Sequence, residues 1–438
     1  MEWYAALALL LGLLLGFMAI GLPVAFAFFA VNVVGAWAFL GGEAGLPQLA
    51  RNAMASLTSF SLAPIPLFLL MGEVLFHTGL AFKAVDAIDK LITRVPGRLS
   101  IVSILGGTVF ASLSGSTVAN TAMLGSILLP EMLKRGYHPS MAMGPIMATG
   151  GIAMLIPPSA LAVLLGSLAD ISIARLLIAG IIPGLLMSLF YLTYVVGRCT
   201  LEPSLAPSYD VTALGLRERL MPVLFRVVPL FAIFFVVVGS IIAGLATPTE
   251  SAALGSVASI LAAAAYRELR WRDLVVAVRE TAKISVMILF IIVASITFSQ
   301  ILAFSGAADG VLGLVGGLGY SPGAVVAGML LVLLMLGMFM DQVSMMMITL
   351  PFFMPLARQM GIEPVWLGVL FLVALEIGFT TPPFGLILYV MQGVAPKGTT
   401  MRQIIVAVAP FIVLELLVLM LMFAFPELST WLPSITVR

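Results

Sequence analysis

Charged residues are scarce in this chain, and long hydrophobic runs take their place. Of its 438 residues only 9% carry a formal charge and 62% are hydrophobic, whereas about a quarter of an ordinary soluble domain is charged. The mean hydropathy is +1.19, and apolar segments run along nearly the whole length. A soluble fold cannot bury that much apolar surface, so the sequence predicts an all-α, polytopic protein whose solvent is the lipid bilayer.

Cysteine and histidine are scarce too, and this excludes several kinds of site. The one cysteine, Cys199, excludes an internal disulfide and a thiolate metal site. Two histidines argue against a histidine-rich metal centre. The net charge is +1, with basic residues only in short clusters, so no extended surface for nucleic acid is expected. Because no basic segment precedes the first apolar stretch, we expect a permanent span rather than a cleaved signal peptide.

Ten apolar stretches approach the roughly 20 residues that cross a bilayer. They lie near 3–20, 23–41, 61–79, 140–168, 174–197, 228–246, 249–266, 284–304, 364–392 and 403–425. Two further stretches, 101–133 and 324–357, are each too long for one span and are interrupted at the centre by small or polar residues. These interruptions lie at 112–116 and 337–341.

Basic residues give the orientation of these spans. All 21 lysines and arginines fall on one side of the arrangement except Arg51, Arg175, Arg358 and Arg438. By the positive-inside rule that side is cytoplasmic. Both ends of 101–133 then face the cytoplasm and both ends of 324–357 face outside, so each stretch is predicted to be a re-entrant hairpin.

An internal repeat at an offset of 225 residues is the strongest signal. The matching landmarks are Pro130, Gly136, Pro139 and Pro157-Pro158 in one unit, and Pro355, Gly361, Pro364 and Pro382-Pro383 in the other. Each unit contains a span, a hairpin and a proline-broken span, at about 61–168 and 287–392. Because the first unit enters from outside and the second from inside, we predict an inverted-topology repeat, which is typical of secondary transporters.

The two double prolines predict where ions bind. Adjacent prolines remove two amide donors and force the preceding residue out of the helix, which frees carbonyls at about 153–158 and 378–384. Free carbonyls at the end of a half-helix suit a small cation. We expect each hairpin tip to face such a break and to add oxygens, from Ser112, Ser114 and Ser116 in the first and from Gly337 and Asp341 in the second. The amide ends of the returning arms suit an anion. Together these features predict a sodium-coupled carboxylate carrier.

Polar residues inside the membrane are candidates for the site, because they are costly in lipid. Among the carboxylates Glu73, Asp341, Glu376 and Glu415, Asp341 and Glu376 are favoured because they lie in the broken repeat, whereas Glu415 is expected to meet another subunit or a polar neighbour. The residues expected to bind substrate are Ser116, Asn120, Pro157, Ser159, Asp341 and Pro382. The structural alternatives are packing of small residues between helices and proline kinks without function.

Several motifs together resemble a known family, the large membrane subunit of tripartite ATP-independent periplasmic (TRAP) transporters. They are Gly21-Leu22-Pro23, the segment 107–130 with the core SGSTVAN, 156–159, 246–250, 337–341 and 381–383. The resemblance covers essentially the whole chain. It implies an elevator-type permease of a bacterial inner membrane, with the two repeats as transport domain and with 1–60, 169–286 and the C-terminal helix in 393–438 as scaffold.

The resemblance also implies a function and partners. Such permeases import organic acids with a sodium gradient, a separate small four-helix membrane subunit and a soluble periplasmic substrate-binding protein; no enzymatic activity and no cofactor are expected. Mapped by position, one Na⁺ site would use Ser112, Ser114, Ala153, Ile156 and Pro158, largely through carbonyls. The other would use Gly337, Gly378, Thr381 and Phe384. A glycine is often found in the family where this chain has Ala153.

Three other interpretations stay open on the residues alone. A stand-alone sodium- or proton-coupled anion exchanger would take up substrate without a binding protein. An intramembrane serine protease would pair Ser114 with His77, but such an enzyme has no need of an inverted repeat. A channel is the third class, against which the two-sided hairpins favour alternating access.

Overall fold

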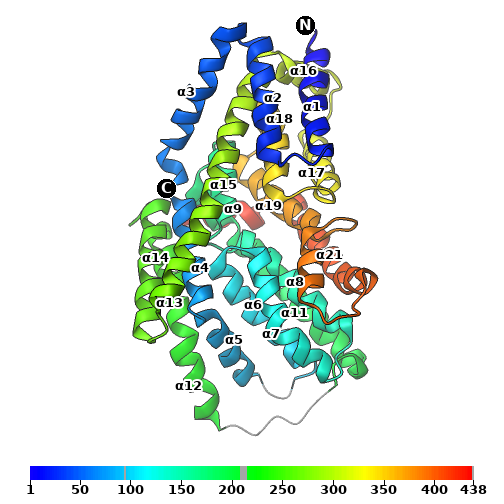
Figure 1. Cartoon of the computed structure of the whole chain (residues 1–438). Coiled ribbons are helices and arrows are strands. Elements are labelled where there is room, and N and C mark those ends of the chain that lie inside the picture. Colours follow the sequence, from blue (N-terminus) through cyan, green and yellow to red (C-terminus); the bar gives the residue numbers. More distant parts are fainter. Residues whose placement is uncertain (93–94, 208–214, 437–438) are drawn as a thin grey trace.

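Figure 1 shows the computed structural model, which describes residues 1–92, 95–207 and 215–436. Every regular element in those ranges is a helix. The two predicted repeat units are built from helices that come in the same order. In the first unit they are α4 (Pro64–His77), α5 (Leu80–Leu91), α6 (Arg98–Ser114), α7 (Thr117–Lys134), α8 (Pro139–Leu155) and α9 (Ala160–Ala169). In the second they are α15 (Trp271–Phe304), α16 (Ala307–Gly317), α17 (Pro322–Gly337), α18 (Gln342–Gln359), α19 (Pro364–Thr380) and α20 (Leu386–Val394).

The matching helices begin at matching positions. Helices α7 and α18 begin 225 residues apart, as do α8 and α19. Between them the chain turns at Gly136 and Gly361, with φ of +80° and +67°, a conformation that side chains other than glycine rarely adopt. Gly136, Gly361, Pro139 and Pro364 therefore mark real helix ends, whereas Pro130 and Pro355 lie inside α7 and α18.

The remaining helices flank these two series. Before the first come α1 (Trp3–Ala19), α2 (Val24–Phe39), η1 (Gly42–Gly45), α3 (Leu46–Leu57) and η2 (Phe60–Leu62). Between the two come α10 (Ile173–Ala179), α11 (Ile181–Leu201), η3 (Pro203–Leu205), α12 (Leu216–Arg226), α13 (Val228–Ile242) and α14 (Pro248–Ala265). After the second come α21 (Met401–Ala424) and α22 (Glu427–Thr436).

Helices α8 and α19 form the centre of the molecule. Every residue from Met141 to Leu155 in α8 and from Leu367 to Thr380 in α19 is buried. Helices that are apolar all round belong in a core, and these two contact each other as well as α21, with α6 and α7 against α8 and α17 and α18 against α19. The helices that lead into the two proline-broken segments are thus surrounded by protein, and irregular backbone at membrane depth is tolerated beside protein.

Helix α15 runs along much of the molecule and joins two cores (Figure 1). It packs against α4 along one part of its length and against α2 and α3 along another. Near its C-terminal end Phe298 and Ile301 pack with Phe28 in a separate cluster, and Asn32 donates a 2.7 Å hydrogen bond to the carbonyl of Ala294.

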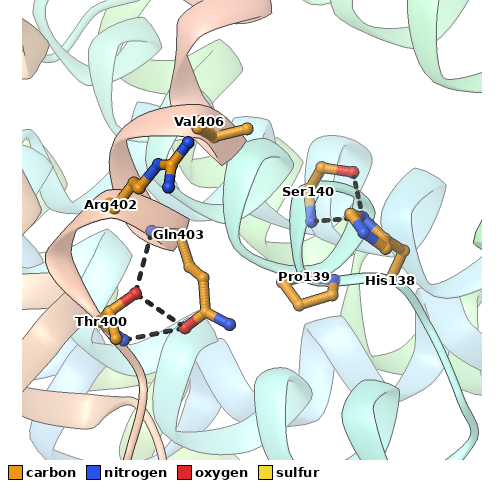
Figure 2. Close-up of a pocket in the computed structure, with 7 residues that line it drawn as sticks. All are labelled: His138, Pro139, Ser140, Thr400, Arg402, Gln403 and Val406. Carbon is orange, nitrogen blue, oxygen red and sulfur yellow. Dashed lines mark hydrogen bonds between the residues drawn. The ribbon is translucent and has the colours of Figure 1, made fainter.

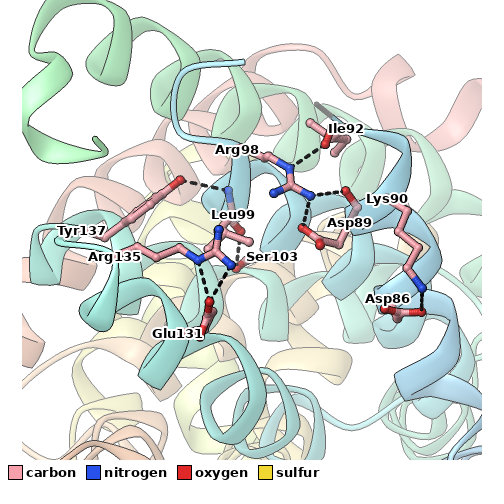
Figure 3. Close-up of polar contacts among 10 residues, drawn as sticks. All are labelled: Asp86, Asp89, Lys90, Ile92, Arg98, Leu99, Ser103, Glu131, Arg135 and Tyr137. Carbon is pink, nitrogen blue, oxygen red and sulfur yellow. Dashed lines mark hydrogen bonds and ion pairs between the residues drawn. The ribbon is translucent and has the colours of Figure 1, made fainter. Parts of the chain in front are cut away.

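The segments predicted to be cytoplasmic meet at one end of the molecule. Lys83 forms an ion pair with Glu268, and Arg226 reaches Asp86 at 2.6 Å, so the ends of α5, α12 and α14 lie together. Arg98, at the start of α6, donates to the carbonyl of Ile92 at 2.6 Å (Figure 3). These contacts tie together three stretches that the basic residues assign to one side.

The base of the first hairpin is closed by direct contacts (Figure 3). The backbone amide of Leu99 donates to the hydroxyl of Tyr137 at 3.2 Å, and the hydroxyl of Ser100 donates to the carbonyl of Met141 at 2.6 Å. The start of α6 therefore lies beside the end of α7, as a hairpin requires.

Several helices lie where the sequence predicted loops. Helices α3, α5, α12, α16 and α22 fall between the predicted spans or beyond the last one. Because most of them carry charged residues among apolar ones, hydropathy alone does not mark them. The expected basic loop at 267–283 is largely the start of α15, so the predicted boundary at 286 falls inside one continuous helix.

The predicted spans can be compared with the helix lengths. Five helical segments are long and apolar enough to cross a membrane, and α8 with α9, bent by 44°, makes a sixth. Helices α1 and α2 have 17 and 16 residues and are slightly shorter than the usual crossing length. The polytopic character holds for the part of the chain that the structure describes.

Candidate ion and substrate site

The tip of the first hairpin lies against the break in the first bent helix. Gly115 joins α6 to α7 with φ of +59°, and a Cβ added to it would lie 3.1 Å from the carbonyl oxygen of Pro158. On another side, a Cβ on Gly72 of α4 would lie 2.6 Å from the carbonyl oxygen of Ser114. The tip is thus held between α4 and the α8–α9 break.

The break itself leaves backbone carbonyls without donors. Helix α8 ends at Leu155, and Ile156 is extended, with φ of −84° and ψ of 120°. Pro157 and Pro158 have no N–H to offer the carbonyls of Ala153 and Met154 four residues earlier. Helix α9 then begins after Ser159, whose hydroxyl accepts a 3.2 Å hydrogen bond from the amide of Ala162. This residue caps a helix.

The second hairpin tip contacts the second break in the same way. A Cβ on Gly337 would lie only 2.4 Å from the Cα of Gly378, and the amide of Phe384 donates to the carbonyl of Met338 at 3.2 Å. Thr381 ends α19 with φ of −85° and ψ of 131°, which matches Ile156. Its hydroxyl donates to the carbonyl of Ile377, so the lone pairs of the hydroxyl oxygen stay available to a cation.

The two breaks differ in exposure. Around the first, Ile156 is 4% exposed and Ser159 is fully buried. Around the second, Thr381 and Pro382 are half-buried and Phe384 is 56% exposed. Each hairpin tip therefore reaches the break of its own repeat, through Gly115 with Pro158 and through Gly337 with Gly378, and of the two breaks the second is the more exposed.

The predicted polar side chains at the tips form hydrogen bonds with backbone groups. Ser116 accepts a 3.3 Å hydrogen bond from the amide of Ala119 at the start of α7. Asp341 does the same for α18, where its carboxylate accepts from the amides of Val343 and Ser344 at 3.0 and 3.1 Å. The hydroxyl of Ser112 donates to the carbonyl of Val109 at 2.8 Å, and that of Ser114 accepts weakly from the amide of Ser116, at 3.4 Å.

A buried carboxylate stands between the two repeats. Glu376 of α19 is 1% exposed, and its Oε2 accepts from Nε2 of Gln342 at 3.1 Å and lies 3.5 Å from the hydroxyl of Thr117. These two partners are the first residues of α18 and α7. Thr117 and Thr121 lie four residues apart and were expected to line one wet face, but the sequence analysis did not pair Glu376 with Thr117 or Gln342. The offset of 225 residues places Thr117 opposite Gln342.

Two other predicted residues are fully buried. Asn120 is 0% exposed, and neither Nδ2 nor Oδ1 of its side chain has a hydrogen-bond partner. Glu415 has a polar neighbour, as expected, because Tyr191 donates to its Oε1 at 2.7 Å and Thr380 to its Oε2 at 3.4 Å.

The cavities lie away from the hairpin tips. One of about 390 Å³ lies between the starts of α8 and α21 and is lined by His138, Arg402 and Gln403 among others (Figure 2). Another of about 260 Å³ is lined in part by Arg358 of α18. Neither is lined by a predicted ion or substrate residue. Within the described ranges no three His, Cys, Asp or Glu side chains come together.

Comparison with known proteins identifies the family. A family model described as "Tripartite ATP-independent periplasmic transporter, DctM component" matches residues 11–428. The chain belongs to this family. It is a family of transporter permeases and not of enzymes, which removes the protease interpretation.

Two curated relatives agree with this assignment, and one solved structure has a similar fold. The chain is 32% identical over 393 residues to the C4-dicarboxylate TRAP transporter large permease protein of Pseudomonas aeruginosa, covering 88% of this chain and 89% of that one. It is 32% identical over 398 residues to the 2,3-diketo-L-gulonate TRAP transporter large permease protein of Escherichia coli, covering 89% and 90%. The YdaH transporter of Alcanivorax borkumensis has a similar fold, with a TM-score of 0.61 at 15% identity over 91% of this chain and 95% of that one.

Proposed function

We propose that this TRAP permease couples the import of an organic acid to Na⁺, and that the two breaks are the Na⁺ sites. The observation that carries the proposal is the contact of each hairpin tip with the break of its own repeat, at Gly115 with Pro158 and at Gly337 with Gly378. Each contact places donorless carbonyls beside the end of a hairpin arm, and oxygen ligands without a titratable base suit Na⁺.

The substrate is an organic acid delivered by a periplasmic binding protein. The relatives are named for C4-dicarboxylates and for 2,3-diketo-L-gulonate, which are carboxylates. The start of α7, capped by the neutral hydroxyl of Ser116, offers backbone amides that favour an anion. Ser116, Asn120, Pro157, Ser159, Asp341 and Pro382 remain the proposed substrate contacts. The partners are a separate small membrane subunit and the binding protein, and the location is the bacterial inner membrane.

Transport proceeds by an elevator motion of the two repeats. The topology that supports this is inverted, with α6–α7 entering from the cytoplasm and α17–α18 from the periplasm. The basic segments gathered near α5, α12 and α14 support the first half of this assignment. The unequal exposure of the two breaks fits a carrier that opens one side of its site at a time.

The test is a Na⁺ titration of uptake in proteoliposomes that contain the permease and its small subunit. Radiolabelled C4-dicarboxylate and 2,3-diketo-L-gulonate are offered with the cognate binding protein. In Thr381→Val the side chain keeps its shape and loses one oxygen, so we expect about 1–3 kcal/mol of lost cation binding and a half-saturating Na⁺ concentration roughly 5- to 150-fold higher. Thr193→Val, which removes an exposed hydroxyl bonded to Leu189, is the matched control and should behave like the wild type.

Two results would change this assignment. Uptake that is driven by a pH gradient and is indifferent to Na⁺ would replace sodium with the proton as the coupling ion. Full uptake without the binding protein would favour the stand-alone exchanger.

A further inference from the structure

The contacts of Glu376 are unusual for a buried carboxylate. Oε2 accepts a hydrogen bond from the side-chain amide of Gln342 at 3.1 Å. Its other partner is the hydroxyl of Thr117, which also donates to the carbonyl of Gly150 at 3.1 Å. Oε1 has no hydrogen-bond partner, and no lysine, arginine or histidine of the described chain is paired with it. An ionised carboxylate with so few partners is costly when it is only 1% exposed.

Unpartnered oxygens gather on the α7 face beside this carboxylate. Asn120 and Thr121 lie three and four residues after Thr117, so all three share one face of the helix. Both are 0% exposed, and the side-chain oxygens of both lack a hydrogen-bond partner. Buried polar side chains without a partner are rare in native proteins and call for an occupant that satisfies them.

A pair of glycines in α8 brings these groups together. A Cβ on Gly150 would lie 2.7 Å from Cγ2 of Thr117 and 3.1 Å from the hydroxyl oxygen of Thr121. A Cβ on Gly151 would lie 2.5 Å from Cγ and 2.9 Å from Oε1 of Glu376. Because neither position has a side chain, α7 can approach α8 at Gly150 and α19 can approach α8 at Gly151.

We infer that Glu376 is a ligand of an additional Na⁺ ion, bound between the two repeats with the oxygens of Thr117, Asn120 and Thr121 as further candidate ligands. All of these are hard oxygen donors. A single carboxylate neutralises a monovalent ion, whereas a divalent ion would stay uncompensated by charge. The ion would satisfy Oε1 and bridge α19 of the second repeat to α7 of the first. This inference rests on the proposed sodium coupling, and it adds a site apart from the two breaks.

The experiment is equilibrium binding of ²²Na⁺ to the purified permease, kept with its small subunit. Glu376→Gln retains the shape of the side chain and an oxygen that Gln342 can donate to, but removes the charge. We expect this variant to bind one Na⁺ fewer per chain than the wild type. Glu376→Asp retains the charge with a shorter side chain, and it should keep the full number of ions with at least fivefold weaker affinity for one of them.

The matched control is the same substitution at the neighbouring buried carboxylate. Both oxygens of Glu415 have partners in Tyr191 and Thr380, so Glu415→Gln should bind as many ions as the wild type. If Glu376→Gln does not purify as a monodisperse protein, Thr117→Val is measured instead. We expect this variant to bind one of the Na⁺ ions with at least fivefold weaker affinity.

The outcomes separate this inference from the proposed function. Equal numbers of bound Na⁺ with unchanged affinities in wild type and in Glu376→Gln, or in Thr117→Val, would overturn the additional site and leave the two breaks untouched. A wild-type protein that binds no Na⁺ at all would overturn the proposed sodium coupling and this inference with it.

Discussion

The closest backbone approach at the site lies between Gly337 and Gly378, and it gives the sharpest test of the hairpin contact. In Gly378→Ala the new Cβ would lie 2.6 Å from the Cα of Gly337, whereas ordinary contact begins at 3.4 Å. Because the obstacle is backbone, the tip of the second hairpin has to move by roughly 0.8 Å, the difference between those distances. The 3.2 Å hydrogen bond from Phe384 to Met338 would then exceed the ordinary length of such bonds.

The magnitude follows from the cost of overpacking. Inserting a methyl group into a packed contact costs about 1–3 kcal/mol, and if the closed tip completes the Na⁺ site, that energy is lost from cation binding. The half-saturating Na⁺ concentration for uptake should therefore rise roughly 5- to 150-fold. Gly337→Ala should do the same. Because the two residues share one contact, the double variant should cost less than the sum of the single variants.

Two control substitutions separate the tip from general packing. Gly328→Ala lies on the same helix, α17, in open space, and should match the wild type in both stability and Na⁺ dependence. Gly144→Ala is as tight, with its Cβ 2.4 Å from the carbonyl oxygen of Ala407, but lies away from the tips. It should lower the melting temperature without changing the Na⁺ concentration for half-maximal uptake. If Gly378→Ala shows wild-type Na⁺ dependence, or only the loss of stability seen in Gly144→Ala, the reasoning is refuted.

Two further predictions concern stability alone. Tyr191→Phe leaves Oε1 of Glu415 without its 2.7 Å donor, so thermal unfolding in detergent should show a loss of about 1–3 kcal/mol; an unchanged melting temperature would mean that water replaces the hydroxyl. The hydrogen bond from Lys83 lowers the pKa of the partly exposed Glu268. This pair therefore stabilises the fold above the ordinary carboxylate pKa of 4.5, and the effect is lost as the pH falls from there through the lowered pKa. The stability difference between wild type and Lys83→Gln should shrink on acidification, and a constant difference from pH 7 to 4 would contradict the assignment.

The hairpins and breaks were predictable because their signals are local. Two adjacent prolines, as at 157–158 and 382–383, remove two amide donors and so interrupt a helix locally, and the repeated spacing showed that the two pairs occupy matching positions in a repeat. The capping role of Asp341 could also have been predicted from the sequence, because an aspartate before an apolar run is a common helix cap. The sequence analysis treated it as a site residue, and the structure adds its capping bonds to the start of α18.

The surroundings of Glu376 were not predictable, because they depend on contacts between residues far apart in the chain. Thr117 lies 259 residues from Glu376 in the chain. Gly151 lies beside Glu376 only because α8 packs against α19. The short helices α5 and α16 were missed for a different reason. With 12 and 11 residues they are too short for a span, and a search for long apolar stretches passes over them. Isolated helices of this length are only marginally stable in water and depend on packing.

The contacts around Glu376 also bear on which parts of the protein move. They join α19 of the second repeat to α7 and α8 of the first, entirely within the buried centre. Sliding one repeat past the other would break these contacts and expose the donorless carbonyls of both breaks, at a cost of several kcal/mol for each unsatisfied group in lipid. We therefore expect the two repeats to move as one body. We expect the sliding surface to lie at the flanking helices, where α2 and α3 pack on α15 and where α14 packs on α4, and not at the contacts around Glu376.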